Sequence, residues 1–112
     1  MPLHNNIIEI GDQAFDDCYF RGILNLPENL LIIGERAFRG NQFSGELKFP
    51  QSLSVLGGQA FESNQRLTGI VEFPEELISI TPSVFANCSN LQGVVISKNV
   101  ETIREGAFEN CI

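Results

Sequence analysis

The 112-residue sequence predicts a solenoid, in which short coils of one repeating pattern stack on one another. The first observation is a phenylalanine that returns after 23, 23, 24 and 23 residues, at Phe15, Phe38, Phe61, Phe85 and Phe108. The second is a proline that keeps the same interval, at Pro27, Pro50 and Pro74. A unit of this length cannot bury its own apolar side chains, so each unit must be covered by its neighbours.

Each unit divides into three elements. An alternating apolar pair precedes the proline, as at Leu24 and Leu26, and predicts a short strand with both side chains inward. Proline ends that strand because it cannot donate to a ladder. An L-x-x-I pattern, as at Leu30 and Ile33, then predicts a second extended segment. The Ala-Phe segment that follows predicts one tight helical turn, and the phenylalanines are expected to stack from coil to coil.

The unit reads G-x-L-x-L-P-x-x-L-x-x-I-G-x-x-A-F-x-x-C/N and resembles the BspA-like, or Treponema-type, leucine-rich repeat. Residues 26–38 match this unit almost position for position, and the resemblance extends from Leu3 to Cys111. It implies a leucine-rich-repeat solenoid, a right-handed stack of about five 23-residue coils with short β-strands and short helical or 3-10 turns. We expect one domain, a fragment of a longer array, with units at approximately 3–25, 26–48, 49–72, 73–95 and 96–112.

For function, the resemblance implies a non-catalytic interaction and adhesion module of a cell-surface or secreted protein. Its partners would be extracellular proteins or glycans bound through the strand faces, and the family carries no catalytic residues to transfer. The alternative is a structural spacer or self-assembly element, because no polar cap is visible at either end and open ends could associate. No charged-then-apolar leader opens the sequence, so no signal peptide is visible.

Composition excludes several classes of activity. The chain has 14 acidic and 7 basic residues, a net charge of -7 that disfavours nucleic acid and anionic membranes as partners. Its longest apolar run, residues 30–33, is too short for membrane insertion. His4 is the single histidine, so a Ser-His-Asp or Cys-His site has almost no support. We expect no enzyme activity, no cofactor and no metal site.

The three cysteines share one repeat position with two asparagines, three residues after each phenylalanine: Cys18, Asn41, Asn64, Cys88 and Cys111. This pattern predicts a small side chain at a turn that satisfies or crowds nearby backbone. Cys88 and Cys111 lie in adjacent coils, within reach of a disulfide, although parallel side chains disfavour the bridge. Whether these two thiols stay reduced is left open.

A partner surface is predicted from outward positions of the two strands of each unit. Its candidate residues are Ile23, Asn25, Leu31, Ile32, Glu46, Lys48, Val55, Ile70, Glu72, Ile78 and Val95. Several are apolar where a solvated coil favours polar side chains, and exposed apolar stripes mark interaction sites. The competing interpretation is that β-branched residues simply suit strands.

Overall fold

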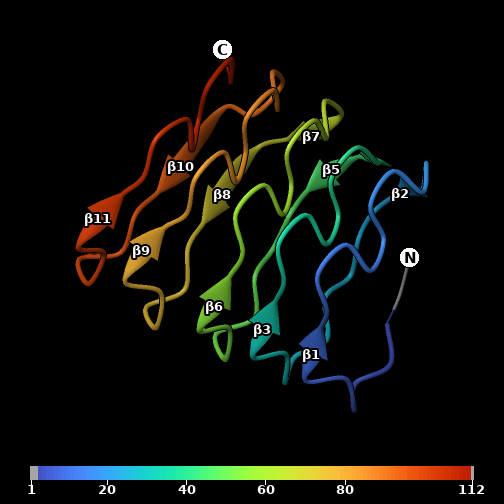
Figure 1. Ribbon diagram of the computed structural model, residues 1–112, viewed down its shortest axis with the longest axis horizontal. Coiled ribbons are helices and arrows are strands. Elements are labelled where there is room, and N and C mark those ends of the chain that lie inside the picture. The colour runs from blue at the N-terminus through green and yellow to red at the C-terminus, as the bar shows by residue number, and fades with distance from the viewer. Residues whose placement is uncertain (1–2, 112) are drawn as a thin grey trace.

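A computed structural model of the chain describes residues 3–111 and shows a stack of coils joined by parallel strand pairs (Figure 1). The expected leucine-rich-repeat solenoid is confirmed, with about four turns spaced about 23 residues apart. Residues 1, 2 and 112, which the expected domain includes, lie outside the described part.

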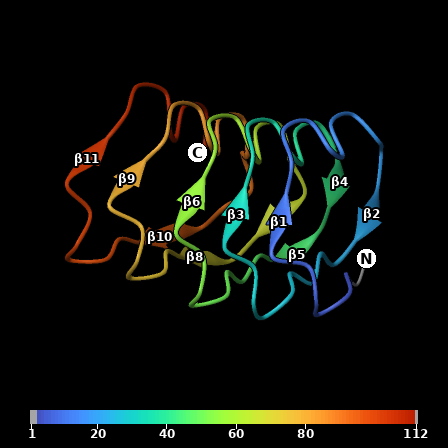
Figure 2. The same cartoon turned by 60° about the horizontal axis from the view of Figure 1, so that its bottom comes forward.

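One row of strands comes from the L-x-x-I segments, and we call it the LxxI row. It contains β1 (Glu9–Ile10), β3 (Ile32–Ile33), β6 (Val55–Leu56), β9 (Ser79–Ile80) and β11 (Thr102–Ile103), which face the viewer in Figure 2. Parallel register joins Ile10 to Ile33 and Ile33 to Leu56, one repeat apart. The same side chains point inward, and all three are buried.

The second row comes from the segments that precede each proline, and we call it the LxL row. Its strands are β2 (Arg21–Gly22), β4 (Gln42–Phe43), β5 (Gly45–Glu46), β7 (Leu67–Thr68), β8 (Ile70–Glu72) and β10 (Gly93–Val95). They pair in parallel as β2 with β4, β5 with β7 and β8 with β10.

These strands begin earlier than the alternating apolar pairs predict. β2 ends at Gly22, before Leu24, and only β8 and β10 reach into the alternating positions. Gly22, Gly45 and Gly69 have φ of +83°, +76° and +75°, which bends the chain next to the pair. A glycine takes this conformation without steric cost, so the regular extended segment is divided there.

The Ala-Phe segments form tight turns, and the helical turns expected there are absent from residues 3–111. Two positions in each unit explain this, because residues two before and two after the phenylalanine have positive φ, as at Gln59 and Ser63. A left-handed residue cannot continue a right-handed helix. The amides instead bond between coils, as Phe38 N–H donates to Ala60 O at 2.9 Å and Phe61 N–H to Val84 O at 3.0 Å.

The phenylalanines form a continuous stack through the core, which we call the Phe spine. Successive ring centroids from Phe15 to Phe85 lie 5.3 to 5.5 Å apart, and Phe85 and Phe108 are 6.4 Å apart. The rings are within 16° of parallel. Phe49 and Phe73 stack beside the spine at 5.9 Å. Burying each such ring contributes about 1.5–3 kcal/mol to folding.

A glycine follows each of the first three LxxI strands, and at two of these positions neighbouring backbones come into close contact. A Cβ added at Gly34 would lie 2.5 Å from Asp12 N, and one added at Gly57 would lie 2.5 Å from Gly34 C. Real Cβ atoms do not approach backbone this closely, so the backbone itself would have to move. The glycines are therefore required by the spacing between the first three coils.

The LxxI row is divided between β6 and β9. Thr81 stands at the position of Gly57 in the next unit, but Arg104 replaces the same glycine one unit later and β9 still pairs with β11, so loss of the glycine does not by itself divide the row. β1, β3 and β6 form one sheet, whereas β9 pairs with β11 in another. Thr81 Oγ1 donates to Gly57 O at 3.3 Å across the boundary, and the Phe spine continues past it. We call this boundary between β6 and β9 the seam.

We expect Gly57→Ala to destabilise the chain by about 1–3 kcal/mol, because the added methyl group overpacks a backbone contact. Gly11→Ala is the matched control, since a Cβ there meets nothing within 4 Å. The control should change the free energy of unfolding by less than about 0.5 kcal/mol. Urea unfolding followed by circular dichroism measures both variants, and equal stabilities would contradict the argument.

Candidate interaction surfaces

The residues predicted for partner binding lie on two rows and do not form one patch. The LxL row carries Ile23, Asn25, Glu46, Lys48, Ile70, Glu72 and Val95. The LxxI row carries Leu31, Ile32, Val55 and Ile78. All of them are exposed except Ile32, which is half-buried. The turn after each LxL segment, beginning at the proline column, separates the two rows along the whole stack.

On the LxL row, glycines shape the surface on which the outward side chains rest. A Cβ at Gly45 would lie 3.3 Å from the Ile23 side chain, and one at Gly93 would lie 3.8 Å from Ile70. A Cβ added at Gly69 would contact the side chain of Glu46. Each outward side chain therefore leans over the glycine of the following coil.

Two adjacent hollows open along this row. One has a volume of about 470 Å³ and is lined by Ile23, Leu24, Asn25, Leu26, Glu46 and Lys48. The other has a volume of about 530 Å³ and is lined by Glu46, Leu47, Lys48, Phe49, Gln51, Ile70, Glu72 and Val95. Glu46 and Lys48 line both hollows, so the two hollows are adjacent. Their combined lining contains both apolar and charged side chains.

The LxxI row is apolar as well but has a different pattern. Ile8, Leu31, Val55 and Ile78 are 41 to 55% exposed, and polar residues such as Ser54 stand between them. Ile103, expected to point inward like Ile80, is 53% exposed because no further coil covers it among residues 3–111. Sequence reasoning missed this position, since its place in the repeat is that of a core residue.

The position shared by asparagine and cysteine caps the Phe turns. Asn64 Nδ2 donates to Phe38 O at 2.8 Å in the preceding coil and to Phe61 O at 3.0 Å in its own. The thiol of Cys88 donates to Phe61 O at 3.1 Å in the same way. One small donor thus satisfies a carbonyl of the neighbouring coil, which explains why the two residue types alternate at this position.

The cysteines are free thiols, and the structure brings none of them into a disulfide among residues 3–111. Burial raises the pKa of the Cys88 thiol to about 12 and also raises the pKa of Cys111. A thiol that stays protonated is a poor nucleophile and a poor metal ligand. Inside the stack the Cys88 thiol donates to Phe61 O at 3.1 Å and the Cys111 thiol to Phe85 O at 2.8 Å.

Arg39 and His4 have hydrogen-bond partners within the chain. Arg39 holds the carboxylate of Asp16 with two hydrogen bonds of 2.9 and 3.1 Å, which joins the first two coils and raises the pKa of Arg39. His4 is exposed, and its Nδ1 accepts the amide of Asn6 at 3.0 Å. Residues 3–111 contain no group of three or more His, Cys, Asp and Glu side chains placed to hold a metal ion.

Comparison with known proteins settles the family. The model of the BspA type leucine-rich repeat region matches residues 1–112 with six copies. The chain belongs to the BspA-type leucine-rich repeat family. This BspA-type chain resembles a crystal structure of a leucine-rich repeat protein from Bacteroides ovatus, with a TM-score of 0.90 and 28% identity. It also resembles the T. pallidum leucine-rich repeat protein, with a TM-score of 0.85 and 26% identity.

The chain covers only part of these solved relatives. It aligns over 98% of its own length with 28% of the Bacteroides chain, and over 97% with 50% of the T. pallidum chain. Among curated proteins no match was found. BspA-type repeats often occur in surface or secreted proteins, and leucine-rich repeat folds typically bind proteins and are generally non-catalytic. Across residues 3–111 no helix has the length and hydropathy of a bilayer crossing.

The raised pKa of Cys88 predicts a specific loss of stability in alkali. An unfolded thiol ionises near pH 9.0, whereas the folded one ionises near pH 12, so unfolding releases a proton between these values. The free energy of unfolding should fall by up to about 1.4 kcal/mol per pH unit in that range.

Asparagine occupies the same repeat position at Asn41 and Asn64 and keeps a hydrogen-bond donor there. Cys88→Asn should therefore remove the fall in the free energy of unfolding between pH 9 and pH 12. Urea unfolding of both proteins at several pH values between 8 and 12 measures the difference. Parallel curves for the two proteins would contradict the prediction.

Proposed function

We propose that this BspA-type chain is a non-catalytic interaction and adhesion module of a cell-surface or secreted protein. Its partner is an extracellular protein that docks on the LxL row. The observation that carries this proposal is the pair of adjacent hollows formed by Ile23, Glu46, Lys48, Ile70 and Glu72.

The chemistry of the LxL row fits a protein partner. Ile23, Ile70 and Val95 are 56, 54 and 48% exposed, and they stand beside carboxylates and one ammonium group. Protein interfaces combine an apolar centre with a polar rim, and this row presents both. The side chains are carried by short paired strands, so little ordering is needed on binding.

Both rows carry hollows, since Ile32 and Val55 line one of about 780 Å³ on the LxxI row, but the LxL row carries two adjacent ones. Binding energy concentrates where an anchor side chain fills a pocket that excludes water. The hollows around Ile70 and Glu46 provide such pockets, whereas Ile78 projects from the LxxI row as an isolated exposed side chain. We therefore treat Leu31, Ile32, Val55 and Ile78 as a second, weaker surface.

Ile70→Ser should weaken partner binding about tenfold or more, which corresponds to about 1.4 kcal/mol. Ile78→Ser is the matched control, because the two side chains are 54 and 55% exposed on different rows. A panel of extracellular matrix and cell-surface proteins identifies the partner, and surface plasmon resonance measures each variant. Equal losses for both variants, or no partner in the panel for the full-length protein, would contradict the proposal.

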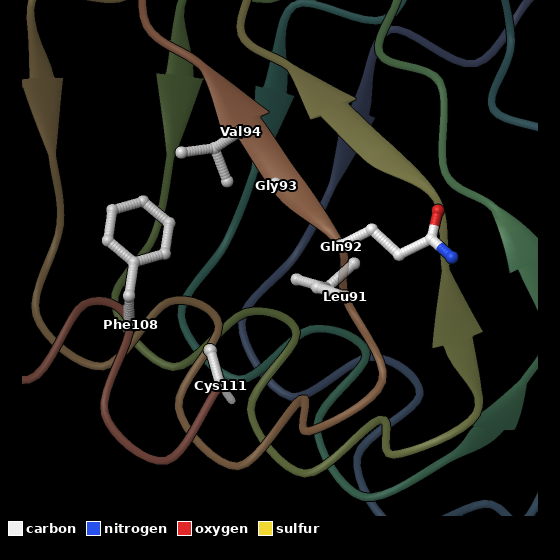
Figure 3. Close-up of a pocket in the computed structure, with 6 residues that line it drawn as sticks. All are labelled: Leu91, Gln92, Gly93, Val94, Phe108 and Cys111. Atoms are coloured by element: carbon white, nitrogen blue, oxygen red, sulfur yellow. The ribbon is translucent and has the colours of Figure 1, made fainter.

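A second candidate function is a spacer or self-assembly element. An apolar hollow of about 260 Å³ lies between β10 and the last Ala-Phe turn and is lined by Leu91, Gln92, Gly93, Val94, Phe108 and Cys111. Figure 3 shows Val94 and Phe108 on the two sides of this space. The occupant we propose in this case is a second copy of the chain, stacking in the manner of a further coil.

Sedimentation velocity tests self-assembly directly. The sedimentation coefficient should rise with concentration from low to high micromolar, because stacking buries the exposed ends of the apolar columns. Val94→Asp should abolish the increase by placing a charge in the hollow. A strictly monomeric wild type over this range would rule out the second candidate and leave the first one standing.

A further inference from the structure

Tyr19 departs from the repeat in a way that packing does not explain. Its side chain is 72% exposed, the highest value among the large hydrophobic residues described, and its φ is +59°. The other non-glycine residues with positive φ lie at the two repeated positions beside each phenylalanine, whereas Tyr19 lies outside them. A bulky residue in this conformation is rare, and such strain is often found at ligand sites.

Tyr19 borders a polar hollow of about 330 Å³ on the edge of the stack. The hollow is lined by Tyr19, Gly40, Asn41, Gln42, Ser63, Gln65 and Arg66. These residues come from the turns that follow the Ala-Phe segments of the first three coils and from the start of β4. None of them lines the two LxL hollows. One aromatic ring thus stands next to amide, hydroxyl and guanidinium groups.

The floor of the hollow is held in place by Asn41. Its Nδ2 donates to Phe15 O at 2.8 Å and to Phe38 O at 3.0 Å, and its Oδ1 accepts from Phe20 N–H at 3.0 Å. Gln42 belongs to β4, which pairs with β2 through Arg21. The groups around the hollow are therefore carried on a fixed backbone, as a preorganised site requires.

The lining of the hollow carries one positive charge, and the carboxylate of Asp17 lies against Gly40 at its border. The chain carries a net charge of -7, yet none of the described residues that line the hollow has a carboxylate, and Arg66 supplies a positive charge. Among residues 3–111 Arg66 forms no ion pair, because both ion pairs there belong to Arg39. Its guanidinium is available for an external anion.

We propose that this hollow binds a glycan that carries a carboxylate, such as a uronic acid residue. The ring of Tyr19 packs against the apolar C–H face of the pyranose. The amide of Gln65 and the Nε2 group of Gln42, whose Oε1 is buried, bind hydroxyl groups. Arg66 binds the carboxylate through its planar fork of donors.

The experiment is an NMR titration of the whole chain with methyl β-glucuronide and methyl β-glucoside. We expect backbone shifts at Gln42, Gln65 and Arg66, with tighter binding of the glucuronide. Tyr19→Gly removes the ring while glycine accepts the positive φ, so it should keep the wild-type circular dichroism and weaken binding about tenfold. Tyr19→Phe keeps the ring and should bind within about twofold of the wild type.

Arg66→Gln should abolish the preference for glucuronide and leave glucoside binding unchanged. Arg104→Gln, which removes an exposed arginine far along the chain, is the control and should retain the preference. Ile70→Ser should also retain sugar binding, so this proposal and the protein-binding proposal fail independently. Absence of shifts around the hollow with either sugar, wild-type binding by Tyr19→Gly, or equal affinity of the wild type for the two sugars would overturn it.

Discussion

Contact between equivalent residues of neighbouring coils holds this molecule together. Each phenylalanine of the spine packs on the phenylalanine one coil away, and its backbone amide donates to that neighbouring coil. The small donor at the asparagine or cysteine position satisfies the carbonyl on the other side. Because every coil uses the same contacts, stability comes from interfaces between coils rather than from within them. The outer surface is therefore free to vary.

The sequence predicts the core well because the core repeats. Phe61 and Leu53 lie where the periodicity places them, and both are fully buried. The Ala-Phe turns were predicted less well, since the left-handed residues there include Gln59 and Arg36, whose side chains carry no turn signal. Their conformation is set by amides that bond to the next coil, a tertiary effect that local propensity does not contain.

The candidate surfaces could be predicted only in part from the sequence. Ile70 and Ile78 could both be identified as outward positions, and both are exposed. The sequence alone could not assign them to two rows with differently shaped surfaces. The shape of the surface depends on contacts between coils, such as the Ile70 side chain lying over Gly93. Tyr19 was missed altogether, since a single aromatic residue at a turn has no periodic signal. Its importance depends on the side chains of two other coils.

The seam interrupts one row of strands and leaves the stack continuous. At this boundary the LxxI row lacks the strand pairing that joins β3 to β6, while Phe61 and Phe85 still stack at 5.5 Å. Backbone hydrogen bonds of 3.0 Å from Gln59 N–H to Pro82 O and from Phe61 N–H to Val84 O also cross it. At this one place in the LxxI row, the aromatic column and the Ala-Phe turns therefore replace strand pairing as the contact between neighbouring coils.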